Sequence, residues 1–107
     1  MKTPELIEQL GELIKQDFDR ILEEQVGFKL IKNPDPSSQE YYYDNDKHVI
    51  MEEDLNAIFE AFKERYAIYG IGLLISPNKL YFGIAHLSEQ QRLVTIAELK
   101  KLLLKQQ

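Results

Sequence analysis

A long apolar stretch, Tyr66 to Leu87, constrains the fold of this chain more than any other segment, because a turn signal divides it in two. The signal is Ser76–Lys79, with the sequence SPNK. Proline pre-sets φ at the second turn position, and asparagine tolerates the third. We therefore predict a β-hairpin with strands at about 68–76 and 79–87.

The register of this hairpin follows if Pro77 and Asn78 form the loop. One face is then wholly apolar, and a shift of one residue would mix the two faces, which favours this pairing. A longer loop with a bulge is the alternative, because two-residue hairpin loops prefer other turn types than Pro-Asn supplies. The predicted pairs are Ile75–Leu80, Leu73–Phe82 and Ile71–Ile84 on the apolar face, and Leu74–Tyr81, Gly72–Gly83 and Gly70–Ala85 on the other.

The small residues of the second face, Gly72 and Gly83, have two interpretations. Either a helix packs closely against them, or a partner or second copy of the chain approaches the shallow surface that they leave. The second interpretation makes Gly72, Gly83 and the neighbouring Tyr81 candidates for binding a partner.

Hydrophobic periodicity outside the hairpin predicts the remaining elements. Helices are expected at 4–25, 52–66 and 88–106, and strands at 26–32, 39–44 and 47–51. The first helix has an apolar face of Leu6, Ile7, Leu10, Leu13, Ile14, Phe18, Ile21 and Leu22. The second helix has a predicted buried stripe of Leu55, Ile58, Phe59, Phe62 and Tyr66. We expect one α+β domain over 1–107. It has a mostly antiparallel sheet of about five strands and three helices, in the order α-β-β-β-α-β-β-α.

The start of the last helix is open to two interpretations. Ser88 and Gln91 match a capping box, which predicts a start at residue 88. Thr95 and Glu98 match one too, so residues 92–96 could instead form a short extra strand. The apolar positions of this helix are wider than one stripe, which indicates burial by the sheet and by a second subunit.

The composition excludes several classes of protein. The net charge is −5, which argues against nucleic-acid binding through a broad basic surface. Residues 1–60 carry a net charge of −9 and residues 61–107 one of +4, so the two halves could attract each other within one molecule or across a dimer. No apolar run reaches the roughly 18 residues that span a bilayer, and we expect no membrane association. The absence of cysteine and of a signal-peptide core predicts a cytoplasmic protein.

The sequence contains no catalytic, cofactor or metal motif that we can identify. Asp44, Asn45 and Asp46 begin like a calcium loop, but Val49 stands where the loop needs glycine. The two histidines, His48 and His86, lie on separate predicted strands without nucleophile or metal-ligand spacing. We therefore expect no catalytic residue, no cofactor and no metal, and a protein that is not an enzyme.

Three consecutive tyrosines, Tyr41, Tyr42 and Tyr43, form the most unusual local feature. Alternation along a strand places Tyr42 on the opposite face from the other two, so one face keeps an aromatic side chain near solvent. Tyrosine is favoured in binding patches, which makes all three candidates for contact with a partner. The neighbouring Glu40, Asp44 and Asp46 could turn this strand into an acidic, aromatic surface that binds a basic protein or imitates nucleic acid.

The second half of the chain carries a family resemblance. The helix LNAIFEAFKERY leads into GIGLLISPNKLYFGIAHLS, a hairpin that ends near a serine-capped last helix. In element order and composition this resembles the class I type III secretion chaperones, which are dimeric effector-binding proteins. The chain departs from the family in its short length, its long first helix and its first strands, which are poor in apolar residues. No individual functional residue is carried over.

The function predicted from the sequence is a non-enzymatic protein-binding module of chaperone, adaptor or inhibitor type that forms a homodimer. The alternative is an acidic inhibitor of a basic nucleic-acid-binding protein, of the kind used in phage or plasmid counter-defence. The candidate partner-binding residues are Tyr41, Tyr42, Tyr43, Asp44, Asp46, Gly72, Gly83 and Tyr81.

Overall fold

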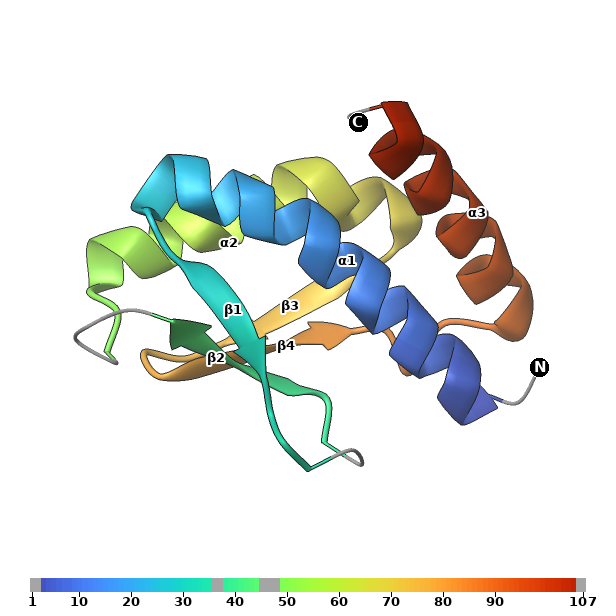
Figure 1. Cartoon of the computed structure of the whole chain (residues 1–107), viewed down its shortest axis with the longest axis horizontal. Helices are drawn as coiled ribbons and strands as arrows, with labels where there is room; N and C mark the ends of the chain where they lie inside the picture. Colours follow the sequence, from blue (N-terminus) through green and yellow to red (C-terminus); the bar gives the residue numbers. More distant parts are fainter. Residues whose placement is uncertain (1–2, 36–37, 45–48, 106–107) are drawn as a thin grey trace.

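A computed structural model describes residues 3–35, 38–44 and 49–105 of the chain (Figure 1). The fold is α+β, as predicted. The elements are α1 (Thr3–Val26), β1 (Lys29–Lys32), β2 (Glu40–Asp44), α2 (Glu52–Tyr66), the 3₁₀ turn η1 (Ala67–Tyr69), β3 (Gly72–Ile75), β4 (Lys79–Gly83) and α3 (Glu89–Lys105).

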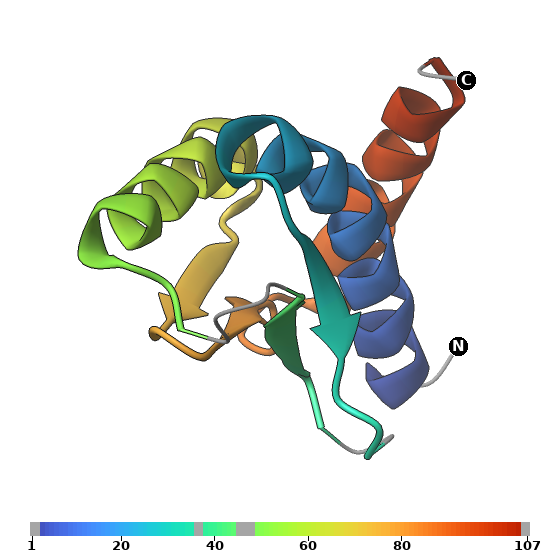
Figure 2. The same ribbon diagram turned by 60° about the vertical axis from the view of Figure 1, so that its left-hand side comes forward.

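The strands form one layer and the helices the other. The four strands pair antiparallel in the order β1-β2-β4-β3. Helices α1 and α2 lie side by side over one face of this sheet, and α3 packs against α1 (Figure 1, Figure 2). We call the face under the helices the inner face; its side chains are Leu30, Tyr41, Tyr43, Leu73, Ile75, Leu80 and Phe82.

The described sheet has four strands instead of the predicted five. The predicted strand at 47–51 is not seen at 49–51, and residues 45–48 lie outside the described part of the chain. Ile50 is buried, and its N–H donates to the Pro77 carbonyl at 2.7 Å, so this segment contacts the hairpin turn without joining the ladder. Strand β2 pairs with β1 on one side and with β4 on the other.

The hairpin has the predicted register but shorter strands. Four of the predicted pairs form, with Gly72 opposite Gly83 at one end and Ile75 opposite Leu80 at the other. The loop is Pro77-Asn78, so the longer loop is not needed. The first strand begins late because the helix continues into η1, which ends at Gly70 in the left-handed conformation.

Apolar spacing along the helices sets what they bury. Helix α1 places Leu6, Leu10, Ile14, Phe18 and Leu22 in the core, as predicted. In α2 the buried positions are Ile58, Phe62 and Tyr66, whereas Phe59 is 41% exposed. Phe59 was expected in the buried stripe, but it lies one residue, or 100° of helical rotation, beyond Ile58.

The last helix follows the longer of the two interpretations. Residues 92–96 are helical, so the extra strand does not form. The capping box at its start is present: Ser88 Oγ accepts from the Gln91 N–H at 3.1 Å, and Gln91 Oε1 accepts from the Ser88 N–H at 2.8 Å. Within the described part of the chain, no helix combines the length and apolar character that crossing a membrane requires.

Candidate functional site

The face of the sheet opposite the helices is the leading candidate for a functional surface. None of the described helices covers it (Figure 2). Its side chains alternate with those of the inner face along every strand. We call it the outer face; its residues are Lys29, Ile31, Glu40, Tyr42, Asp44, Gly72, Leu74, Lys79, Tyr81 and Gly83.

Four large apolar side chains lie on the outer face, in two pairs. Ile31 is opposite Tyr42, and Leu74 is opposite Tyr81. Their exposed fractions are 49%, 37%, 51% and 40%, respectively. We call the first pair the β1/β2 corner and the second the β3/β4 corner. Single exposed apolar residues are ordinary, but two cross-strand pairs on one uncovered sheet face form a patch.

The charges of the outer face balance one another. Glu40 and Lys79 lie between the two corners, and Lys79 Nζ donates to Glu40 Oε1 at 2.9 Å. This hydrogen bond and the charge of Glu40 raise the pKa of Lys79. Lys29 lies opposite Asp44 at the rim. The face therefore carries two positive and two negative side chains around its apolar corners.

The structure divides the residues predicted to bind a partner. Tyr42, Asp44, Gly72, Tyr81 and Gly83 lie on the outer face. The prediction that Tyr42 faces away from its two neighbours is confirmed, since Tyr41 and Tyr43 are buried on the inner face. Asp46 lies outside the described residues.

The two buried tyrosines, Tyr41 and Tyr43, join β2 to the β3/β4 hairpin. The Tyr43 hydroxyl donates to the Ser76 carbonyl at 2.8 Å, which ties β2 to the hairpin turn. Tyr41 packs on Phe82, with ring centroids 5.0 Å apart. Burial raises the pKa of both phenols well above their ordinary range; for Tyr41 the charges of Glu12, Asp19 and Glu8 add to this effect. Both side chains are only 3% exposed and lie on the inner face.

Sequence reasoning missed two kinds of residue. Ile31 belongs to the β1/β2 corner, and alternation with Leu30 in the predicted strand was the signal that could have placed it there. Asp17 was not singled out at all, although it is fully buried between α1 and α2. A polar residue inside the apolar stripe of α1 was the signal for a buried pair.

Asp17 is the centre of a buried polar cluster. The Arg65 guanidinium donates to both of its carboxylate oxygens, at 2.9 Å and 3.0 Å, and the Tyr66 hydroxyl donates to it as well. Burial and then the bond to Asp17 raise the pKa of Tyr66 far above its ordinary range. The bidentate pair joins α1 to α2 and leaves the carboxylate fully satisfied, which is a structural role.

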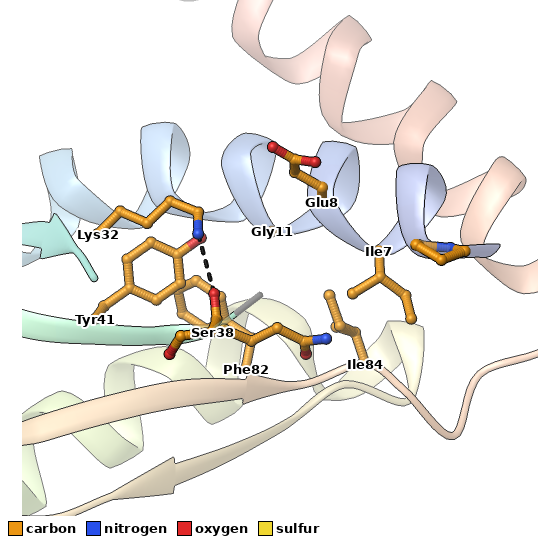
Figure 3. Close-up of a pocket in the computed structure, with 10 residues that line it drawn as sticks. Ile7, Glu8, Gly11, Lys32, Ser38, Tyr41, Phe82 and Ile84 are labelled. Carbon is orange, nitrogen blue, oxygen red and sulfur yellow. Dashed lines mark hydrogen bonds between the residues drawn. The ribbon is translucent and has the colours of Figure 1, made fainter. Parts of the chain in front are cut away.

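A groove of about 290 Å³ lies between the start of α1 and the sheet (Figure 3). Ile7, Phe82 and Ile84 give it apolar walls, and Lys32 Nζ donates to the Ser38 carbonyl at its rim at 3.0 Å. Among the described residues, the groove brings together no pair placed as nucleophile and base. It therefore offers space for a small apolar group.

The groove explains a glycine that is costly in a helix. Gly11 lies inside α1, where glycine costs roughly 1 kcal/mol relative to alanine. A Cβ at this position would lie 3.2 Å from the Tyr41 hydroxyl oxygen, which is tighter than nine in ten real Cβ contacts. Gly11 therefore lets β2 bring Tyr41 close to the helix.

The groups that could carry chemistry are not brought together in the described part of the chain. His86 is exposed in the turn after β4, where Nε2 lies 2.9 Å from the Gly70 carbonyl, and His48 lies outside the described residues. The described residues contain no cluster of three or more histidine, aspartate or glutamate side chains that could hold a metal ion.

A second exposed apolar patch lies on α3. Leu93, Val94 and Leu104 are 47%, 51% and 68% exposed, so the helix is buried on one side only. The second side, predicted to be covered by another subunit, is open in the single chain. Lys100 and Lys101 interrupt this patch, whereas the apolar pairs of the outer face are directly opposite each other on neighbouring strands.

Comparison with known proteins adds no family to these observations. Neither the models of protein families, nor the curated proteins, nor the solved structures yield a match to this chain.

Proposed function

We propose that this chain is a non-enzymatic protein-binding module of chaperone, adaptor or inhibitor type, and that it binds its partner through the outer face. One observation carries the proposal: four large apolar side chains, each 37% to 51% exposed, lie on a sheet face that no described helix covers. The surface of an antiparallel sheet that faces water is commonly polar. This one has apolar corners instead.

The chemistry of the outer face indicates the kind of surface that fits it. Tyr42 and Tyr81 offer large, rigid side chains with a polar tip, a combination favoured in protein interfaces. The charge between the corners is one positive and one negative group. The matching partner is therefore a protein surface with an apolar centre and charges of both signs, since a strongly basic or acidic surface would find as many repulsive contacts as attractive ones.

The experiment is affinity capture from the source cell with three tagged proteins. The wild type is compared with Tyr81→Glu on the outer face and with Ile68→Glu. Ile68 is 86% exposed on η1, outside the strands that form the outer face, and serves as the matched control. We expect the partner to be captured by the wild type and the control, and to be reduced by about tenfold or more with Tyr81→Glu. Identical captures with all three proteins would contradict the proposal.

The alternative function, an acidic inhibitor of a basic protein, has less support on this surface. Of the acidic residues around the tyrosines, Glu40 is bonded to Lys79. Asp44 is opposite Lys29, whose Nζ lies 3.8 Å from Glu23 Oε2. An inhibitor of that type predicts binding that weakens steeply as salt is added. The same capture repeated at low and high salt distinguishes the two functions.

A further inference from the structure

The four large apolar side chains of the outer face are arranged with approximate two-fold symmetry. Tyr41 lies opposite Leu80 at the centre of the sheet. A half-turn about a line through this pair, perpendicular to the sheet, carries the β1/β2 corner onto the β3/β4 corner: Tyr42 falls on Tyr81, and Ile31 falls on Leu74. The two apolar corners are therefore equivalent patches at opposite ends of one diagonal.

The same half-turn carries Glu40 onto Lys79, so the other diagonal of the face has a negative end and a positive end. A surface of this pattern is complementary to itself. If two copies meet face to face about an axis along the apolar diagonal, each apolar corner meets the same corner of the partner. Glu40 of one protomer then lies toward Lys79 of its partner, and the reciprocal contact forms as well.

We propose that the outer face binds a second copy of this chain and forms a two-fold symmetric, face-to-face dimer. This inference rests on the proposed function, because it assigns the occupant of the same face. Charge complementarity at the centre of the face selects a second copy, because the symmetric arrangement brings Glu40 of each protomer to Lys79 of the other. The two Lys29 residues meet at one end of the axis, where Lys29 Nζ lies 3.8 Å from Glu23 Oε2 of its own chain.

The size of the face sets the expected strength of the dimer. Its ten residues per protomer compare with about 20–30 in a standard protein interface. We therefore expect association in the micromolar range. Gly72 lies on the continuation of the line from Tyr42 through Tyr81, close to the proposed axis. A Cβ added to Gly72 would meet nothing within 4 Å in the single chain, so this position is open in the monomer and crowded in the dimer.

The first test is sedimentation velocity of the purified protein from about 1 μM to about 500 μM. The wild type should change from monomer to dimer over this range, and Gly72→Gln should weaken association by about tenfold or more. Ile68→Gln and Leu93→Gln are matched controls on η1 and α3, and they should dimerise like the wild type. A wild type that stays monomeric overturns the inference, and so does a dimer that Leu93→Gln weakens and Gly72→Gln does not.

The second test uses charge reversal. Glu40→Lys and Lys79→Glu should each weaken self-association, because each places like charges across the interface. An equimolar mixture of the two variants should dimerise again, since every contact at the centre then joins unlike charges. A mixture that associates no better than either variant alone overturns the inference, because a charge effect confined to one chain would not be restored by mixing.

The outcomes separate this inference from the proposed function. A monomeric protein whose captured partner is lost with Tyr81→Glu would mean that the outer face binds a different protein: the proposed function would stand and the dimer would fall. If the protein is monomeric and no capture depends on Tyr81, both fall.

Discussion

The two faces of the sheet are built from the same strands but have opposite environments. On β4, Phe82 is buried beneath the helices and Tyr81, the residue before it, is 40% exposed. Phe82 stacks on Phe62 of α2 with ring centroids 5.6 Å apart, whereas Tyr81 has only Leu74 and Glu40 as cross-strand neighbours. The inner face therefore accounts for the stability of the single chain, and the described helices leave the outer face open.

The largest expected difference between the faces is at these two neighbouring residues. Phe82→Ala should lower the free energy of unfolding by about 3–5 kcal/mol, because it removes a buried ring from between Tyr41 and Phe62. Tyr81→Ala should lower it by less than about 1 kcal/mol. Urea unfolding of dilute protein measures both. Similar losses for the two variants would mean that the outer face is part of the core.

The ion pair between the helices, Asp17–Arg65, should contribute more to stability than the pair on the outer face, Glu40–Lys79. Asp17→Asn should cost about 3 kcal/mol, because it breaks a buried, bidentate pair with Arg65 and disturbs the bond from Tyr66. Glu40→Gln keeps a similar shape and removes only the solvent-exposed pair with Lys79.

The matched measurement is urea unfolding of both variants in dilute solution. Glu40→Gln should leave the unfolding midpoint close to that of the wild type, while Asp17→Asn should shift it clearly. A small shift of the unfolding midpoint for Asp17→Asn would show that the Arg65 guanidinium, which is 30% exposed, is hydrated by solvent when the carboxylate is removed.

The buried tyrosines make the inner face sensitive to alkaline pH. Burial raises the pKa of Tyr43 above its ordinary value of 10.0, so the folded chain keeps a proton that the unfolded chain loses. The stability from this group is complete below about pH 10 and falls at higher pH, by up to about 1.4 kcal/mol per pH unit.

Tyr43→Phe tests this effect. At pH 8 the variant should be less stable by about 1 kcal/mol, since it loses the hydrogen bond to the Ser76 carbonyl. As the pH rises above about 10, the wild type should lose stability faster than the variant, and their order should reverse. Urea unfolding between about pH 8 and pH 11.5 follows the difference. A difference that does not change with pH would contradict the raised pKa.

The smallest expected effects concern the two paired glycines of the outer face. A Cβ on Gly83 would lie 3.3 Å from the Gly72 carbonyl oxygen, so Gly83→Ala must displace the neighbouring strand and should cost about 1 kcal/mol. Gly72→Ala has open space and should be neutral or stabilise the chain by up to about 1 kcal/mol. Thermal unfolding compares them directly, and equal effects would contradict the open environment of Gly72.

Part of the site was predictable because strand alternation is a local rule. The alternation of the three tyrosines placed Tyr42 apart from Tyr41 and Tyr43, and the two-residue loop fixed the pairs Gly72–Gly83 and Leu74–Tyr81. The pairing of β2 with β4 was not predictable, because those strands are far apart in the sequence and no local signal selects a neighbour. That pairing brings Glu40 to Lys79 and makes the outer face one surface.

The sequence by itself determined the elements whose signal lies within one turn or one strand pair: the apolar stripe of α1, the hairpin register and the capping box of α3. Tertiary structure decided which face of the sheet is covered, because this depends on where α1 and α2 pack. It also decided the burial of Asp17, which becomes favourable only when Arg65 and Tyr66 of α2 pack against it and donate hydrogen bonds to its carboxylate. Local signals specify a strand's two faces, but only packing against distant segments assigns one face to the core and leaves the other exposed.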